Sequence, residues 1–134
     1  MQESAKSDLR SGIVFDELSN RVIGAAVEVH KQLGPGFMET IYEQALKIEL
    51  TKRMIAFESQ KQIRVRYESQ VTGNHTLDLV VEGQPIVELK AVKALEDVHY
   101  AQLRSYLRAM GLSVGLLLNF NSPTLIIKRV ECNK

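Results

Sequence analysis

Three side chains in the second half of the sequence, Asp78, Glu88 and Lys90, could together carry out metal-dependent chemistry. Alternate side chains of an extended strand share a face, so Glu88 and Lys90 should point the same way. Both acids lie within runs that are otherwise almost wholly apolar, namely Leu77-Asp78-Leu79-Val80-Val81 and Ile86-Val87-Glu88-Leu89. Such runs indicate central strands covered on both faces. A charge in that position must be paired, bound to a metal ion or functional.

This pattern has two interpretations. Glu-x-Lys is a common tripeptide, and the pair could be a surface ion pair that contributes under about 1 kcal/mol. Alternatively, two carboxylates about 4 Å apart would repel by roughly 4 kcal/mol at an effective dielectric of about 20, and a divalent cation would offset that repulsion. Carboxylate oxygens without His or Cys ligands favour Mg²⁺ or Mn²⁺ over zinc. The apolar surroundings favour the metal site.

The elements that must position these residues follow from hydrophobic periodicity. Helical spacing of apolar residues predicts three helices, over residues 15–33, 38–53 and 96–110. Alternation and β-rich composition predict five strands, over residues 62–67, 76–82, 86–92, 114–120 and 124–130. Gly34-Pro35-Gly36 should end the first helix and Gly111 the third. The predicted order is therefore α-α-β-β-β-α-β-β.

The connection between the second and third strands decides whether the acids can share a site. With a two-residue turn at Gly83-Gln84, Asp78 would face Leu89 and lie on the opposite face from Glu88. A three-residue connection, Gly83-Gln84-Pro85, or a bulge would place Asp78 opposite Lys90 and diagonal to Glu88. We therefore expect a connection with an odd number of residues.

Length and composition predict a single globular domain. The chain has 134 residues, and we expect a polar tail over residues 1–12 followed by one domain over residues 13–134. Its net charge of +1 neither supports nor excludes a nucleic-acid partner. No apolar run approaches the roughly 20 residues that cross a bilayer, and residues 1–10 lack the apolar stretch of a signal peptide. The single cysteine, Cys132, cannot form an internal disulfide, so we expect a cytoplasmic protein.

Four blocks of the sequence resemble a known family. Asp78, a nine-residue gap and Glu88-x-Lys90 resemble the signature of the PD-(D/E)XK nuclease superfamily, and Gly36-x-x-Glu39-x-x-Tyr42 resembles the motif of its GxxExxY subfamily. The likeness extends through LGPGFMETIYEQAL, LDLVVEGQPIVELKAV, HYAQLRSYL and GLLLNF. It implies an α/β fold with the restriction-endonuclease-like αβββαβ core, in which helices flank a central mixed sheet.

The resemblance also implies roles for individual residues. Asp78 and Glu88 correspond to the metal-binding pair, Glu39 to a further carboxylate on a helix, and Lys90 to the lysine beside the attacking water. The carbonyl of Leu89 would complete the ligands of one or two Mg²⁺ (or Mn²⁺) ions. A Glu in the first helical turn is also favoured by the helix dipole alone, so Glu39 has an alternative structural explanation.

The third predicted helix carries further candidates. Gln102 and Tyr106 match a Q-x-x-x-Y element of exonuclease-like branches of the superfamily, and the resemblance implies that they position the site. His99 lies on the same side of the helix, as either a phosphate contact or a packed histidine. The residue before Asp78 is Leu77 where the family name gives proline, a position that varies in the superfamily. Basic residues on the strands could form a rim around the site: Arg64, Arg66, Lys128 and Arg129.

These observations predict a metal-dependent nuclease that hydrolyses phosphodiesters. The expected partner is a nucleic-acid substrate, with DNA favoured over RNA and no membrane, and the sequence leaves open whether the chain forms a homodimer. A second hypothesis is a binding or interaction module that keeps the nuclease fold without turnover. The intact Asp78, Glu88 and Lys90 favour the enzyme, whereas the short chain has no evident DNA-recognition domain.

Overall fold

The computed structural model describes residues 16–132, so the predicted polar tail over residues 1–12 lies outside the described residues. The described chain forms three helices and five strands in the predicted order. They are α1 (Glu17–Leu33), α2 (Glu39–Lys52), β1 (Phe57–Tyr67), β2 (Gln70–Val81), β3 (Ile86–Lys90), α3 (Asp97–Met110), β4 (Val114–Asn119) and β5 (Ile126–Glu131). The predicted α/β class and the αβββαβ core are confirmed.

The two N-terminal helices begin and end at residues suited to those positions. Asp16 caps α1, because its Oδ1 accepts a hydrogen bond from Ser19 N at 2.7 Å. Gly34 ends α1 at a φ of 70°, a value that favours glycine. The hydroxyl of Tyr42, which is buried on α2, donates to the Gly34 carbonyl at 2.6 Å and accepts from Phe37 N at 3.1 Å. The loop between the helices is therefore tied to the second helix, which carries the candidate acid Glu39.

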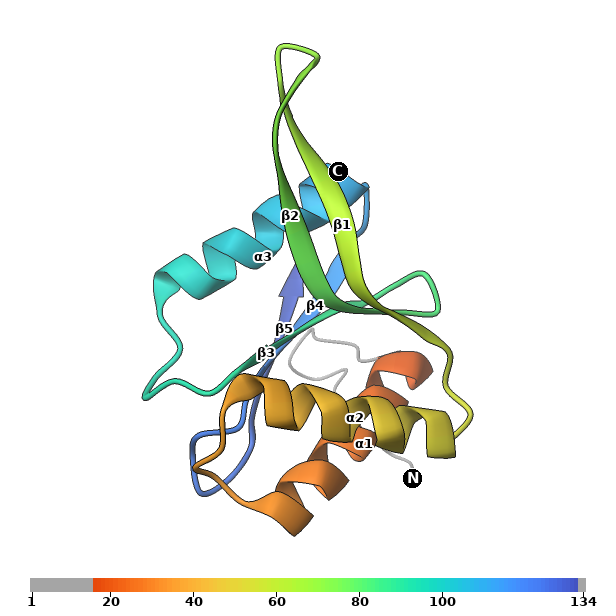
Figure 1. The fold of residues 1–134 in the computed structure, drawn as a ribbon, viewed down its shortest axis with the longest axis vertical. Helices are drawn as coiled ribbons and strands as arrows, with labels where there is room; N and C mark the ends of the chain where they lie inside the picture. The colour runs from red at the N-terminus through yellow and green to blue at the C-terminus, as the bar shows by residue number, and fades with distance from the viewer. Residues whose placement is uncertain (1–15, 133–134) are drawn as a thin grey trace.

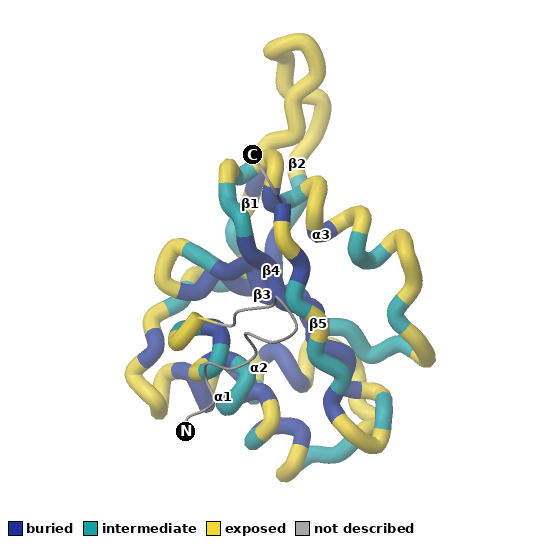
Figure 2. Tube along the Cα trace, turned by 180° about the vertical axis from the view of Figure 1, so that it is seen from behind, coloured by how far each residue is buried: buried dark blue, intermediate teal, exposed yellow. Residues whose placement is uncertain are grey.

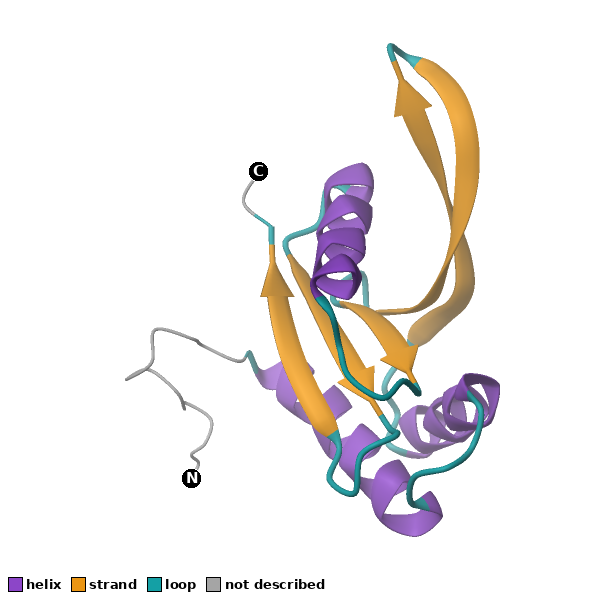
Figure 3. Ribbon diagram, turned by 90° about the vertical axis from the view of Figure 1, so that its left-hand side faces the viewer, coloured by secondary structure: helices purple, strands orange, loops and turns teal. Residues whose placement is uncertain are grey.

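The strands form one mixed sheet in the order β1-β2-β3-β4-β5. β3 and β4 pair in parallel, and the other neighbouring strands pair antiparallel. Helices α1 and α2 cover one face of the sheet and α3 covers the other, as Figures 1 and 3 show. β3 is therefore a central strand covered on both faces, as its apolar sequence predicted.

Each face of the sheet has its own apolar core. Val87 and Leu89 of β3 pack with residues of α1 and α2, whereas Ile86 packs with Leu103 and Leu107 of α3. Helix α3 lies close to β4, because a Cβ added at Gly115 would approach the Leu103 side chain to 2.8 Å. The alternation of β3 thus directs Glu88 and Lys90 toward the α3 side. In the described part of the chain, no helix combines the length and hydropathy that a membrane span requires.

Strands β1 and β2 continue well beyond the rest of the sheet as a two-stranded ribbon, which we call the arm (residues 62–76). The arm projects from the body of the molecule in Figure 1, and every residue from 64 to 74 is exposed, as Figure 2 shows. Only the base of the arm contacts the core, where Ile63 packs among the buried residues on the α3 side. On β2 the arm ends at Thr76, two residues before Asp78.

Candidate active site

The pairing of β2 with β3 brings the two acids of the predicted site together. Leu79 pairs with Val87 and Val80 with Ile86, and this register, carried one residue beyond the last backbone pair, sets Asp78 against Glu88. Each carboxylate accepts a backbone hydrogen bond across this position: Glu88 Oε2 from Asp78 N at 3.1 Å, and Asp78 Oδ2 from Leu89 N at 3.0 Å. The side chains of directly opposed residues lie on one face of the sheet. The expectation that the two acids share a face is confirmed.

The connecting turn differs by one residue from the prediction. Val81 N donates to the Pro85 carbonyl at 3.0 Å, so the connection contains three residues, Glu82, Gly83 and Gln84. Its odd length agrees with the expectation, but its position differs because Pro85 belongs to the paired strand. Gln84 anchors the turn on β4, since its Oε1 accepts from Ser113 N and Val114 N at 2.6 and 3.0 Å.

This shift of the turn changes the register by two residues. Asp78 therefore lies opposite Glu88, and the expectation that it lies opposite Lys90 was wrong.

The two carboxylates occupy a strongly perturbed electrostatic environment. Glu88 is only 6% exposed. Its burial, followed by the neighbouring charge of Asp78, raises the pKa of Glu88 to about 8. Burial also raises the pKa of Asp78 to about 6, although the hydrogen bond from the Leu89 amide and the charge of Lys90 oppose the shift. The pair therefore retains a proton near neutral pH, and a bound cation would replace that proton.

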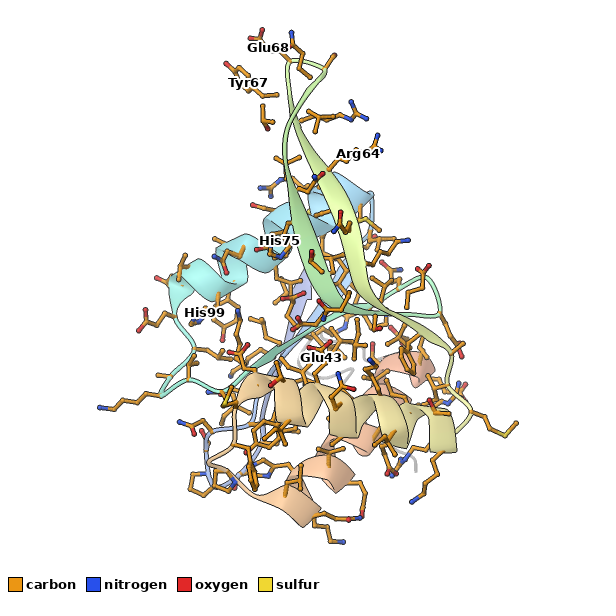
Figure 4. All side chains as sticks on the ribbon, in the orientation of Figure 1. Glu43, Arg64, Tyr67, Glu68, His75 and His99 are labelled. Carbon is orange, nitrogen blue, oxygen red and sulfur yellow. The ribbon has the colours of Figure 1, made fainter. Side chains whose placement is uncertain are left out.

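Helix α2 adds an acid, Glu43, that the sequence analysis did not single out. Glu43 is 7% exposed and lies one turn after Glu39, on the side of α2 toward the sheet in Figure 4. Its charge raises the pKa values of both Asp78 and Glu88, so all three acids share one electrostatic site. The signal in the sequence was its spacing, because residues four apart on a helix lie on the same side.

Gln60 of β1 fixes the orientation of Glu43. Its Nε2 donates to Glu43 Oε2 at 2.5 Å. Gln60 has a φ of 53°, and the pairing of β1 with β2 skips Gln60 and Asp78 between the pairs Ser59–Leu79 and Lys61–Leu77. Neither β1 nor β3 therefore forms a regular backbone pair with β2 at Asp78. This irregularity was not visible in the sequence because residues 58–62 are all polar and carry no alternating pattern that a bulge could interrupt.

Glu39 lies at the edge of this cluster. Its side chain is exposed, yet its Oε2 accepts a hydrogen bond from Ala91 N at 3.3 Å, just beyond the end of β3. Its charge contributes to the raised pKa of Asp78. The carboxylate thus lies toward the sheet without being buried in the cluster. A pocket of about 490 Å³ opens beside it, lined by Gly36, Phe37, Met38, Glu39, Thr40, Ala91 and Asn121.

Lys90 ends β3 on the same face as Glu88. Its carbonyl accepts from Phe120 N at 2.9 Å. The buried Asn119 on β4 holds the chain that follows, since its Oδ1 accepts from Val92 N at 3.1 Å and its Nδ2 donates to Val92 O at 2.9 Å. The charge of Lys90 lowers the pKa values of Asp78 and Glu88. Asn119, which the sequence analysis did not assign, therefore holds the segment from which the lysine projects.

The candidates on α3 divide into one residue at the site and two beside it. Burial, followed by the charges of Glu88 and Asp78, raises the pKa of Tyr106, which places its phenol beside the acidic pair. Gln102 is exposed, and in the described chain its side chain forms no hydrogen bond. His99 has a structural role, because its Nδ1 accepts from Glu96 N at 2.9 Å where α3 begins.

His75, for which the sequence gave no functional support, lies against Tyr106. The two rings stack with centroids 4.0 Å apart and an interplanar angle of 17°, and Figure 4 shows His75 beside α3. Burial, followed by the charge of Lys90, lowers the pKa of His75 and so favours its neutral ring. The stack holds Tyr106 against β2, three residues before Asp78.

The residues present fit a magnesium or manganese ion better than zinc. Among residues 16–132, no three Asp, Glu, His or Cys side chains are arranged closely enough to enclose a metal ion. Mg²⁺, however, commonly binds through one or two carboxylates and keeps several waters. Asp78 and Glu88 supply two such carboxylates. Leu89 donates its amide toward β2, and its carbonyl points the same way because a strand residue directs both groups to one neighbour.

Two comparisons with known proteins found a match to this chain. A family model described as the PD-(D/E)XK nuclease superfamily matches residues 16–130. A solved structure described as the crystal structure of SSO0001 matches with a TM-score of 0.57 at 15% identity, over 71% of this chain and 50% of that one. The chain thus spans about half the length of that structure, and at this identity the likeness concerns the fold alone. No curated protein matches the chain.

Proposed function

Because the chain belongs to the PD-(D/E)XK nuclease superfamily, we propose that it is a metal-dependent nuclease that hydrolyses phosphodiester bonds. Gly36, Glu39 and Tyr42 support its assignment to the GxxExxY subfamily. The observation that carries the proposal is the opposed pair of Asp78 and Glu88, with Lys90 on the same face. A buried pair of acids is unfavourable for stability, and such groups are typical of functional sites.

Asp78, Glu88 and the carbonyl of Leu89 would hold Mg²⁺ or Mn²⁺, with Glu39 contributing at the edge. When bound, the ion supplies positive charge that acidifies water and stabilises negative charge on the phosphate. Asp78 and Glu88 then remain ionised, since the cation offsets both their burial and their mutual repulsion.

The remaining side chains act on the water and the phosphate. The Lys90 ammonium is a donor only, so it can orient the attacking water or contact the scissile phosphate but cannot bind the metal. Its positive charge also favours the transition state, in which negative charge develops on the phosphate. The Tyr106 hydroxyl, on the ring that stacks on His75, would orient the same groups, helped by Gln102 one helical turn before it.

Cleavage of a mixed panel of DNA and RNA tests this proposal. Single-stranded and duplex forms of each nucleic acid would be incubated with the protein in Mg²⁺, in Mn²⁺ and in EDTA. We expect metal-dependent cleavage of DNA, and the Asp78→Asn variant should be inactive under every condition. If the wild type binds nucleic acid and metal but cleaves no member of the panel, the alternative of a binding module with a nuclease fold is supported instead.

The two acids of α2 should differ in their effects on activity. Glu43 is buried and hydrogen-bonded to Gln60, whereas Glu39 is exposed. We expect Glu43→Gln to lower kcat about tenfold or more, because the charge of Glu43 raises the pKa values of both Asp78 and Glu88. Glu39→Gln should lower kcat less and should mainly weaken metal binding.

Steady-state cleavage at several Mg²⁺ concentrations measures both effects. Gln44→Ala, at an exposed position of the same helix, is the matched control and should behave as the wild type. Equal activity of Glu43→Gln and the wild type at saturating Mg²⁺ would remove Glu43 from the site.

A further inference from the structure

Apart from His75 at its base, the arm takes no part in the proposed chemistry. It projects away from the layers of helix and sheet, and all its residues from 64 to 74 are exposed (Figures 1 and 2). Two-stranded ribbons are only marginally stable by themselves. A ribbon that extends this far from the core of a small domain therefore presents a surface that a partner could contact.

The two faces of the arm differ in composition. Ile63 and His75 are paired across the strands, and both face α3, where Ile63 packs in the core and His75 stacks on Tyr106. Because side chains alternate, the neighbouring pairs, Gln62 with Thr76 and Arg64 with Asn74, lie on the other face. Figure 4 shows Arg64 projecting from the arm into solvent.

This second face carries no acid and is mostly polar, although Val71 pairs with Arg66 across it. Arg66 follows Arg64 on β1, opposite a bulge at Thr72 of β2, and adds a second exposed positive charge. In the part of the chain that the structure describes, the side chains of Gln62, Arg64, Arg66 and Asn74 form no hydrogen bond or ion pair. Their donors and acceptors are therefore available to a partner, and the nearest acid along the ribbon is Glu68 at its tip.

Arginine, asparagine, glutamine and threonine are the side chains that hydrogen-bond base edges in the major groove. The major groove of B-form DNA is wide enough for a two-stranded β-ribbon, whereas that of A-form RNA is deep and narrow. We propose that the arm lies in the major groove of duplex DNA next to the cleavage site, with Arg64 and Arg66 contacting phosphates. This inference rests on the proposed nuclease function and specifies its substrate.

The dimensions of the arm set how much DNA it would contact. Gln70, at the tip of β2, lies eight positions before Asp78, which corresponds to about 26 Å at roughly 3.3 Å per residue. At about 3.4 Å per base pair, the arm would extend over about eight base pairs from the scissile phosphate. The arm would thus act as a DNA-recognition element beside the candidate active site.

Binding measured in EDTA, where no turnover occurs, tests this inference. Fluorescence anisotropy with a DNA duplex of about 24 base pairs would compare the wild type with the variant Arg64→Ala/Arg66→Ala over a range of salt concentrations. We expect the variant to bind about tenfold or more weakly. Its slope of log K against log[salt] should be smaller in magnitude by about 1.8, since each phosphate contact in B-form DNA contributes about 0.9.

Two further variants separate a specific role of the arm from general electrostatics. Arg21→Ala/Lys31→Ala removes the same charge from exposed positions of α1 and should keep wild-type affinity and slope. Gln62→Ala/Asn74→Ala should reduce discrimination between DNA sequences while leaving the salt slope unchanged, because these side chains would contact bases. Circular dichroism should show that all variants fold, since the substituted positions are exposed.

The outcomes distinguish this inference from the proposed function. If the Arg64→Ala/Arg66→Ala variant matches the α1 control, or if the wild type binds no duplex DNA, the inference is wrong even where cleavage is observed. If the arm substitutions change sedimentation instead of DNA binding, the arm contacts a second copy of the chain, and the inference is again wrong. If the arm variant loses affinity but the wild type cleaves nothing in any metal, the arm contact stands and the nuclease proposal fails.

Discussion

Substitution of Lys90 by alanine is expected to abolish cleavage while leaving Mg²⁺ binding largely in place. Lys90 carries an ammonium group, which cannot bind a cation. It therefore contributes to catalysis by contacting the attacking water or the phosphate. Removal of one preorganised donor of this kind typically lowers kcat by about 100-fold or more. Metal binding should tighten slightly, because the positive charge that opposes the cation near Asp78 and Glu88 is lost.

The Asp78→Ala variant is expected to lose both cleavage and metal binding. Asp78 supplies an oxygen ligand, and no other carboxylate occupies its position opposite Glu88. Calorimetric titration with Mg²⁺, run beside a cleavage assay, measures both properties in the wild type and in each variant. Lys93→Ala is the matched control for Lys90, because Lys93 is exposed in the segment after β3 and should be dispensable. Wild-type turnover by Lys90→Ala would exclude the proposed mechanism.

Substitution of Glu88 by glutamine is expected to stabilise the metal-free protein at alkaline pH and to abolish cleavage. The folded-state pKa of Glu88 is about 8, well above the ordinary value of 4.5. Such a group binds a proton more tightly in the folded state than in the unfolded state. Its contribution to stability is therefore fully present below about pH 4.5 and is lost as the pH rises through about 8.

The metal-free wild type should accordingly lose stability between about pH 5 and pH 9, at up to about 1.4 kcal/mol per pKa unit by which the folded state exceeds the unfolded state. Asp78 contributes in the lower part of this window, since its folded-state pKa is about 6. Glu88→Gln should have a much weaker pH dependence. The amide keeps an oxygen that can accept the hydrogen bond from Asp78 N, so the strand pairing should persist.

Urea unfolding in EDTA at a series of pH values measures this prediction. Glu82→Gln, in the exposed turn between β2 and β3, is the matched control and should keep the wild-type pH dependence. Added Mg²⁺ should stabilise the wild type most at high pH, where the pair is ionised, and should have little effect on Glu88→Gln. Metal-free stability that rises with pH across this window would contradict the electrostatic description of the site.

Local periodicity in the sequence determined the order of the elements and the identity of the central residues. The change from helical spacing to alternation located all eight elements, and their ends differ from the structure by a few residues except for the two strands that form the arm. These strands are longer than predicted because residues 57–61 and 70–75 lack a continuous apolar pattern, although pairing with each other supports them. Alternation alone placed Glu88 and Lys90 on one face of β3, because that property depends only on neighbouring residues.

The tertiary structure decided which residues meet at that face. A strand can shift by two residues without changing which side chains face the core, so the alternation could not distinguish Lys90 from Glu88 as the partner of Asp78. The hydrogen bond between Val81 N and Pro85 O resolved this choice. Glu43, Gln60 and His75 join the site from α2, β1 and the base of the arm, and their positions depend on how helices pack on the sheet. Contacts between segments so distant in sequence leave no periodic signal in the chain, and they appear only once the layers are assembled.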